Sequence, residues 1–269
     1  MQTTSITSPT NERYKRWKKL ADTPRTSKKL GVTLAEGIHL AQVIRDSEAR
    51  VVSIVLRETG ASAEAVKLAG ELADVKDARV FTVSGALYDA ICPVEHGVGL
   101  TVEFETIQTP RPHVPVRADV LYLDGVQDAG NMGTLIRTAV AAGVRYIAAS
   151  SGSAGLWSPK VMRAGMGAHF GATLFENVTP RDLIDMFDAR RLAADARGGS
   201  DLFRSTGWDE GPTVWMMGAE GPGLSDAALQ VADARYLIPI EASCESLNVG
   251  AAAAVCLFEQ RRRRLLRGE

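Results

Sequence analysis

The stretch that decides the fold is "DVLYLDGVQDAGNMGTLIRTAVAAGVRYIAAS", residues 119–150. Its first eight residues are mostly apolar, which predicts a buried strand. A loop containing glycine follows, and the apolar spacing beyond it predicts a helix that starts near Asn131. Residues 145–150 predict a second strand. A strand, a helix and a strand in this order indicate a parallel sheet.

The same alternation continues towards the C-terminus. Further strands are predicted at residues 172–177, 191–196, 213–218 and 235–240, with helices starting near Ser158, Thr179, Ser225 and Asn248. We therefore expect residues 118–269 to form an α/β domain whose parallel sheet is covered by helices on both faces. Ligands of such sheets bind at the carboxyl ends of the strands, so the loops after each strand are the informative ones.

The N-terminal part predicts a second, smaller α/β domain. Residues 11–105 alternate between strand and helix patterns, whereas residues 1–10 are rich in Ser and Thr and are expected to be a disordered tail. Residues 106–117 contain Pro110, Pro112 and Pro115, which predicts a stiff linker between the two domains.

The composition is that of an ordinary globular protein. The chain has 269 residues, 45% of them hydrophobic and 23% charged, and a formal net charge of −1. Its three cysteines show no CxxC spacing, which argues against a disulfide framework and a zinc site and favours the reducing cytoplasm. No apolar run reaches the ~18 residues of a membrane span, and the N-terminus shows no apolar segment typical of a signal peptide.

Positive charge gathers at the two ends of the chain. Eight Lys and Arg residues lie between Asn11 and Lys29, and Arg261–Arg264 are consecutive. Two basic ends on a neutral body fit a surface for nucleic acid. The alternative is a solvated basic helix face at each end.

The first two informative loops carry polar residues among glycines. The loop after position 124 has neither a G-x-G-x-x-G nor a G-K-[ST] pattern, so it indicates no dinucleotide fold and no nucleotide triphosphatase. In that loop Asn131 can cap a helix, and Arg137 follows six residues later, either at a site or on the solvent face. "MMGAEGPGLS", residues 216–225, surrounds Glu220 with three glycines that let the backbone approach a ligand, or that form a flexible turn.

The third loop precedes the last helix. "EASCESLNVGAAAAVCLFE", residues 241–259, places small polar groups directly before an apolar run. Ser246 and Asn248 can bond the free N–H groups at the helix start, but capping explains one of them and not the whole cluster. The small residues of the helix suggest close packing against another backbone.

Together and in this order, the three loops resemble a known family. The motifs are N-x-G-x-x-x-R, G-x-E-G-x-G-L-S and I-P-x(6)-S-L-N-V. They resemble those of the SpoU/TrmH family of RNA ribose 2'-O-methyltransferases, in the SPOUT superfamily, from about Ala118 to the C-terminus. Residues 158–170 are similar to the family's segment after its second strand. Arg25, Glu36 and Gly37 resemble the "R…EG" pattern of its substrate-binding domain, a small α/β fold akin to ribosomal RNA-binding proteins.

The resemblance implies a deep trefoil knot in the C-terminal domain, a homodimer formed through that domain, and S-adenosylmethionine (AdoMet) as cofactor. No metal is required. The cofactor-binding residues that it implies are Gly218, Ala219, Glu220, Gly221, Gly223, Ile238, Ile240, Ser246 and Leu247. The implied catalytic residues are Arg137, Asn131, Glu220, Ser246 and Asn248, and the implied RNA-binding residues are Arg25, Lys28, Lys160 and Arg163. Ala219, Ser243 and Gly250 depart from the usual residues and leave the geometry of the cofactor loop open.

Transfer of a methyl group from a sulfonium to a ribose hydroxyl is an in-line displacement that also needs the hydroxyl proton removed. By the resemblance, Arg137 is the key residue and has been proposed as the base. A guanidinium with a pKa above ~12 stays charged, so Arg137 can instead hold the adjacent phosphate and stabilise the developing alkoxide. Both roles stay open at this point.

The size of the N-terminal domain favours ribosomal RNA of the large subunit over transfer RNA as the substrate. We expect this domain to recognise RNA through its shape and its 2'-hydroxyls. Two alternatives are weighed. A non-catalytic RNA-binding or ribosome-assembly protein with the same fold is predicted to lack Arg137, Asn131 or the Ser246/Asn248 pair, and all are present. An unrelated nucleotide-binding α/β enzyme lacks support from any phosphate-loop pattern. The target nucleotide is not predicted, nor is a choice between naked RNA and a ribosomal particle.

Overall fold

The computed structural model describes residues 2–23, 25–92 and 97–269. The chain divides into two compact units. Unit 1 comprises Met1–Gln108 and Trp157–Phe170, and unit 2 comprises Thr109–Leu156 and Gly171–Glu269. In the described part of the chain, no helix combines the length and the apolar character that crossing a bilayer demands.

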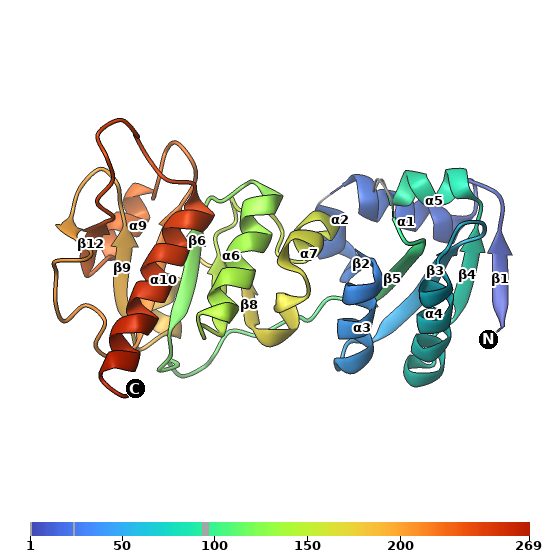
Figure 1. The fold of residues 1–269 in the computed structure, drawn as a ribbon, viewed down its shortest axis with the longest axis horizontal. Coiled ribbons are helices and arrows are strands. Elements are labelled where there is room, and N and C mark those ends of the chain that lie inside the picture. Colours follow the sequence, from blue (N-terminus) through green and yellow to red (C-terminus); the bar gives the residue numbers. More distant parts are fainter. Residues whose placement is uncertain (1, 24, 93–96) are drawn as a thin grey trace. The chain divides into compact units, whose positions relative to one another are not determined.

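Within its described residues, unit 1 holds a five-stranded sheet in the order β1-β4-β3-β5-β2 (Figure 1). The strands are β1 (Thr3–Ile6), β2 (Val32–Glu36), β3 (Val51–Arg57), β4 (Val80–Val83) and β5 (Leu100–Glu105), and β5 runs antiparallel to both of its neighbours. The expectation of a disordered tail over residues 1–10 was wrong at β1, which pairs in parallel with β4. The physical reason is Ile6, which is buried in the core of the unit.

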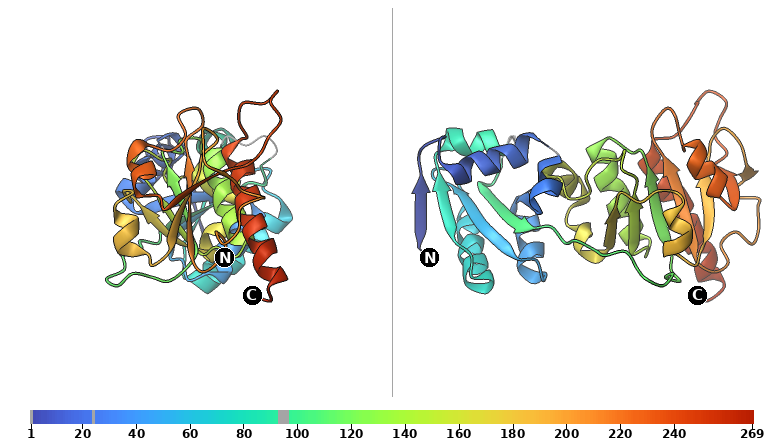
Figure 2. Two further views of the ribbon diagram at one scale, coloured as in Figure 1. Left: turned by 90° about the vertical axis from the view of Figure 1, so that its left-hand side faces the viewer. Right: turned by 180° about the vertical axis from the view of Figure 1, so that it is seen from behind.

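Helices cover both faces of this sheet. They are α1 (Glu12–Asp22), α2 (Arg25–Leu30), α3 (Ile38–Asp46), α4 (Ala63–Lys76) and α5 (Gly85–Ile91). Asn11 begins α1 by accepting bonds from the backbone N–H groups of Arg13 and Tyr14. α1 and α5 bury Trp17 and Tyr88 in one core, while α3 packs beside α4 (Figures 1 and 2).

The basic helix α1 is tied to the sheet by a buried carboxylate. Glu103 is fully buried on β5, where Oε2 accepts bonds from Trp17 Nε1 at 2.9 Å and from Ser53 Oγ at 2.5 Å. Arg16 completes the cluster with an ion pair of 2.8 Å to Glu103 Oε1. A buried charge must be paired, so Arg16 stabilises the core of unit 1 by neutralising Glu103.

Residues 157–170 belong to unit 1 although the sequence assigned them to the C-terminal domain. This segment, which we call the α7 arm, contains α7 (Pro159–Gly165) and packs against β2. Two of its rings lie on Phe104, with centroid distances of 6.2 Å for Trp157 and 5.7 Å for Phe170. Burial of these aromatic rings accounts for the placement of the arm.

Unit 2, which the structure describes in full, has the predicted parallel sheet, in the order β10-β12-β9-β11-β6-β7-β8. Its strands are β6 (Val120–Asp124), β7 (Tyr146–Ala149), β8 (Thr173–Glu176), β9 (Arg190–Ala194), β10 (Ser200–Asp201), β11 (Thr213–Gly218) and β12 (Ala234–Leu237). Its helices are α6 (Ala129–Ala141), α8 (Asp182–Met186), α9 (Asp226–Val231) and α10 (Val249–Leu266). α6 and α10 pack side by side on one face, and α9 lies on the other (Figures 1 and 2).

The proline-rich segment is docked on unit 2 from Thr109 onwards. The backbone N–H of Val116 donates to the carbonyl of Met186 at 2.9 Å, and the N–H of Asp188 donates back to the carbonyl of Val116 at 3.0 Å. Arg111 adds an ion pair of 2.9 Å to Asp182. These contacts order the second half of the segment.

Two of the four consecutive arginines of α10 are engaged by unit 2. The side chain of Arg263 is 14% exposed and that of Arg264 is 19% exposed. Arg263 lies over the ring of Trp208 at 4.9 Å, and Arg264 is paired with Asp119 at the start of β6. Both side chains anchor the last helix to unit 2, so they are not free to act as a nucleic-acid surface.

Candidate active site at the carboxyl edge of the second sheet

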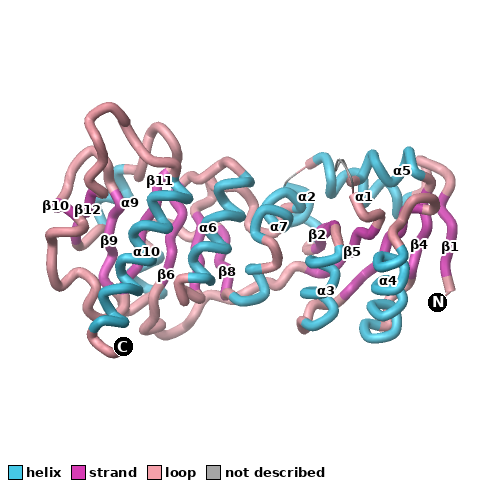
Figure 3. The backbone as a smooth tube through the Cα atoms, viewed as in Figure 1, coloured by secondary structure: helices cyan, strands magenta, loops and turns pink. Residues whose placement is uncertain are grey.

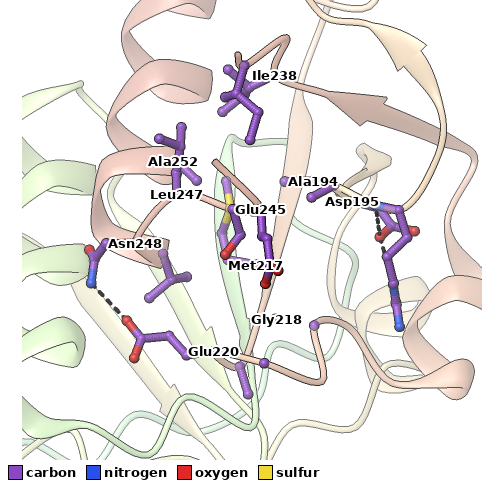
Figure 4. Close-up of a pocket in the computed structure, with 18 of the residues that line it drawn as sticks. Ala194, Asp195, Met217, Gly218, Glu220, Ile238, Glu245, Leu247, Asn248 and Ala252 are labelled. Atoms are coloured by element: carbon purple, nitrogen blue, oxygen red, sulfur yellow. Dashed lines mark hydrogen bonds and ion pairs between the residues drawn. The ribbon is translucent and has the colours of Figure 1, made fainter. Parts of the chain in front are cut away.

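Long loops gather where the strands of unit 2 end, at its upper edge in Figure 3. The loops after β9, β11 and β12, with the start of α10, line a pocket of about 560 Å³ (Figure 4). The lining includes all nine residues predicted to bind a cofactor: Gly218, Ala219, Glu220, Gly221, Gly223, Ile238, Ile240, Ser246 and Leu247. The rule that ligands sit after parallel strands therefore located the pocket.

The loop after β11, residues 218–224, needs its glycines to close on itself. A Cβ on Gly218 would stand 2.1 Å from the carbonyl carbon of Gly223, so no larger residue fits there. Gly223 has a φ of 72°, which favours glycine. Ala219 and Gly223 exchange two backbone hydrogen bonds, of 3.2 and 2.9 Å, across the turn. We call these residues the glycine loop, and Glu220 lies within its turn.

Three of the predicted catalytic residues meet at one edge of the pocket. Glu220 Oε1 accepts hydrogen bonds from Asn131 Nδ2 at 2.7 Å and from Asn248 Nδ2 at 2.8 Å. Asn248 Nδ2 also donates to Asn131 Oδ1 at 2.9 Å. Asn131 lies in the first turn of α6, Glu220 in the β11–α9 connection and Asn248 at the start of α10, so the fold assembles the site from distant segments.

Asn248 explains the polar cluster that precedes the apolar helix. Its Oδ1 caps α10 by accepting from the backbone N–H of Gly250 at 2.9 Å, while its Nδ2 points to the carboxylate of Glu220 (Figure 4). One amide thus begins the helix and joins the site. Asp128, and not Asn131, caps α6, which leaves the side chain of Asn131 for the network.

The other two predicted catalytic residues are placed differently. Ser246 lines the pocket from an exposed part of the β12–α10 loop. Arg137 is exposed on α6, does not line the pocket, and forms no hydrogen bond or ion pair with any residue that the structure describes. The site within this chain therefore joins Asn131, Glu220, Asn248 and Ser246 without the guanidinium.

The four predicted RNA-binding residues all lie on unit 1. Arg25 and Lys28 are exposed on α2, Lys160 and Arg163 are exposed on α7, and both helices pack against β2. Arg163 Nε lies 3.9 Å from the carboxylate of Glu36. Burial raises the pKa of Glu36, and the positive charge of Arg163 opposes that rise.

The basic residues of α1 are mostly compensated by neighbouring carboxylates. Lys15 pairs with Glu12 and Lys18 with Asp22, each at 2.6 Å, and Arg16 is engaged by the buried Glu103. Helix α1 forms the first part of the basic end predicted over residues 11–29. Neighbouring carboxylates neutralise part of its charge.

Sequence reasoning missed the loop after β9. Asp195 and Arg197 line the pocket, as do Met217 and Tyr236. The signal was present, because Arg197 directly follows the strand predicted at residues 191–196 and Asp195 lies near its carboxyl end, where the ligand rule directs attention. Figure 4 shows Asp195 on the side of the pocket opposite Glu220 and Asn248. Three carboxylates, of Asp195, Glu220 and Glu245, and one guanidinium line the pocket.

Comparisons with known proteins agree with this geometry. A family model described as the SpoU rRNA Methylase family matches residues 119–258. The chain is 28% identical over 260 residues to a 23S rRNA (guanosine(2553)-2'-O)-methyltransferase of Bacillus subtilis, covering 95% of this chain and 98% of that protein. It is 32% identical over 162 residues to a 23S rRNA (uridine(2479)-2'-O)-methyltransferase of Streptomyces viridochromogenes, covering 56% of each.

A solved structure resembles the whole chain. It is an AdoMet-bound rRNA methyltransferase from Sinorhizobium meliloti, with a TM-score of 0.84 and 26% sequence identity. The alignment covers 98% of this chain and 99% of that one. The similarity thus includes both units.

Proposed function

Because the chain belongs to the SpoU rRNA methylase family, we propose that it is an AdoMet-dependent RNA methyltransferase that methylates a ribose 2'-hydroxyl of ribosomal RNA. The observation that carries this proposal is the Asn131–Glu220–Asn248 network at the edge of a pocket lined by the family's motif residues. A non-catalytic RNA-binding protein with the same fold was predicted to lack Asn131 or Asn248, and both are part of this network.

The pocket fits AdoMet in size and chemistry. Its volume of about 560 Å³ lies within the usual range for small-molecule sites, about 300–1,000 Å³. Ile238, Ile240 and Leu247 offer an apolar surface suited to the adenine ring, and the three carboxylates suit a ligand that carries a sulfonium. When bound, AdoMet supplies an electrophilic methyl group.

The residues of the chain then orient the hydroxyl and manage its charge. Asn131 and Asn248 hold the Glu220 carboxylate, whose orientation is set before substrate arrives. We propose that Arg137, which stays positively charged, binds the phosphate beside the target ribose and stabilises the developing alkoxide. The hydroxyl proton passes to the phosphate or to water. The methyl group would pass from the sulfonium sulfur to the ribose oxygen, with the sulfur–methyl bond breaking as the oxygen–methyl bond forms and a neutral thioether as the leaving group.

We propose that the protein acts as a homodimer through the α6–α10 face of unit 2. Phe258 is 45% exposed on α10, which packs beside α6, and the exposed Arg137 stands on α6 without a partner among the described residues. Light scattering after size exclusion should give twice the 28.8 kDa mass of one chain. A monomer that keeps full methyl transfer would contradict this proposal.

The deep trefoil knot is proposed on the same family ground. Asn248 bonds to Asn131 in the first turn of α6 and to Glu220 in the β11–α9 connection, so the end of the β12–α10 loop lies beside both segments. Pulling the chain from positions 118 and 269 with optical tweezers tests the knot. A fully extended chain spans about 3.3–3.6 Å per residue. A knotted chain should stop short of this length when pulled, whereas an unknotted chain should reach it.

We assign recognition of RNA to unit 1 through Arg25, Lys28, Lys160 and Arg163. Large-subunit ribosomal RNA is favoured over transfer RNA because the two relatives above are 23S rRNA enzymes. The relatives differ in the base that carries the methylated ribose, one a guanosine and one a uridine, so no target nucleotide is proposed. The three free cysteines support a cytoplasmic location, which we also propose.

Transfer of labelled methyl from AdoMet to purified ribosomal RNA and, separately, to transfer RNA tests the function. We expect label in ribosomal RNA that is lost in Arg137→Ala. Bound cofactor without label in either RNA would require repeating the assay on ribosomal particles. No cofactor binding by the wild type would refute the methyltransferase assignment.

A further inference from the structure

The loop after β9 carries Asp195 and Arg197, and both side chains line the proposed cofactor pocket. Asp195 is 6% exposed and follows the last residue of β9. Its Oδ1 accepts bonds from the backbone N–H and from Nε of Arg197, both at 3.1 Å (Figure 4). The buried carboxylate thus fixes both ends of the arginine, its backbone and its guanidinium.

The same guanidinium holds the glycine loop. Arg197 Nη1 donates to the carbonyl oxygen of Pro222 at 3.0 Å, and Nη2 donates to that of Leu224 at 3.3 Å. No side chain of the glycine loop takes part in these bonds. The contact therefore fixes the course of the backbone between β11 and α9.

A loop with three glycines in six residues needs such external bonds, because glycine loses more conformational freedom on ordering than any other residue. The far end of the loop is held separately, where the backbone N–H of Ser225 donates to Asp124 Oδ2 at 2.8 Å. The Ala219–Gly223 backbone pair closes the turn that carries Glu220.

We propose that Arg197 is a positioning residue. It holds the glycine loop in the conformation that shapes the cofactor pocket and sets the place of Glu220, acting through the carbonyls of Pro222 and Leu224. The link to the cofactor rests on the function proposed above. Arg197 itself is assigned no contact with the reacting atoms.

The geometry requires an arginine. Three nitrogens of one planar group serve three acceptors at once, whereas a lysine presents one flexible ammonium. Arg235, on β12, offers a matched control, because it lies 3.9 Å from Asp195 and bonds no residue of the glycine loop among those described.

The first measurement needs no cofactor. Hydrogen–deuterium exchange of peptides spanning residues 218–224 is compared in wild type, Arg197→Gln, Arg197→Lys and Arg235→Gln. Loss of two charge-assisted bonds should speed exchange of the glycine loop about tenfold in both Arg197 variants and leave it unchanged in Arg235→Gln. Melting curves show whether each variant remains folded.

The second measurement is AdoMet affinity by calorimetry, with KM for RNA and for AdoMet in the transfer assay. Arg197→Lys should raise the AdoMet Kd about tenfold and leave KM for RNA unchanged. The proposal would be overturned if the glycine loop of Arg197→Gln exchanged at the wild-type rate. It would also be overturned if Arg197→Lys kept both the wild-type exchange rate and the wild-type AdoMet affinity. If the wild type binds no AdoMet, the proposed function fails, and the exchange experiment still decides the role of Arg197.

Discussion

Replacement of Gly218 by alanine is the sharpest test of the glycine loop. The added Cβ would stand 2.1 Å from the carbonyl carbon of Gly223 and 2.2 Å from the backbone nitrogen of Leu224. These are backbone atoms, so relief requires the two sides of the turn to separate by about 1 Å or more. Separation breaks the two Ala219–Gly223 hydrogen bonds, each contributing about 1 kcal/mol. We therefore expect Gly218→Ala to weaken AdoMet binding by about 2 kcal/mol, or about 30-fold in Kd by calorimetry.

Gly221 provides the control in the same loop. Its φ is 85°, but an added Cβ meets nothing within 4 Å. Gly221→Ala should therefore cost only backbone strain of about 1 kcal/mol and weaken binding about fivefold. An AdoMet Kd of Gly218→Ala within about twofold of wild type would refute the steric argument, as would a larger loss in Gly221→Ala.

Three further predictions concern α10 and the network. The pKa of Glu259 is lowered to about 2, chiefly by hydrogen bonds from Arg262. The ionised Glu259 therefore stabilises the fold above its ordinary pKa of 4.5, and this stabilisation is lost as the pH falls towards 2. Glu259→Gln should cost about 1 kcal/mol of unfolding free energy at pH 7 and reduce the loss of stability at acid pH, both measured by denaturant titration. Arg264→Gln should cost about 2 kcal/mol of unfolding free energy by the same titration, because its guanidinium is paired with Asp119. For the same reason the salt dependence of RNA affinity should not change. A weaker salt dependence in the variant would show that the basic tail contacts RNA. Glu220→Gln should lower kcat at saturating AdoMet more than it changes the Kd, and an equal effect on both would assign Glu220 to binding alone.

The parallel sheet and the pocket were predictable because each depends on local patterns. Apolar runs set the strands of unit 2, and the ligand rule then selected the loops that hold Gly218 and Asn248. The resemblance added that Asn131, Glu220 and Asn248 act together, which the bonds among them agree with. Periodicity alone does not predict the contacts among these three residues, since they lie in segments far apart in the sequence.

The errors came from partners that are distant in sequence. The acceptor of Arg264 is Asp119, 145 residues away, so the charge pattern of the tail could not distinguish a partly buried ion pair from a solvated face. Strand β1 forms through Ile6, whose burial depends on a core built by later residues. The α7 arm leaves unit 2 because Trp157 and Phe170 find Phe104 in unit 1. In each case tertiary burial overrides a local signal.

The charges of the pocket indicate that the cofactor and the RNA phosphates are bound by different residues. Asp195, Glu220 and Glu245 make the lining acidic, and its one guanidinium, that of Arg197, is already bonded to Asp195 and to two carbonyls. An acidic pocket suits a sulfonium and repels a phosphate. A cation for the RNA backbone must therefore come from outside the pocket, and Arg137 is exposed, charged and bonded to no described residue. This separation supports the proposal that Arg137 acts as a phosphate and alkoxide clamp, because a guanidinium free of carboxylates keeps its whole charge for the substrate.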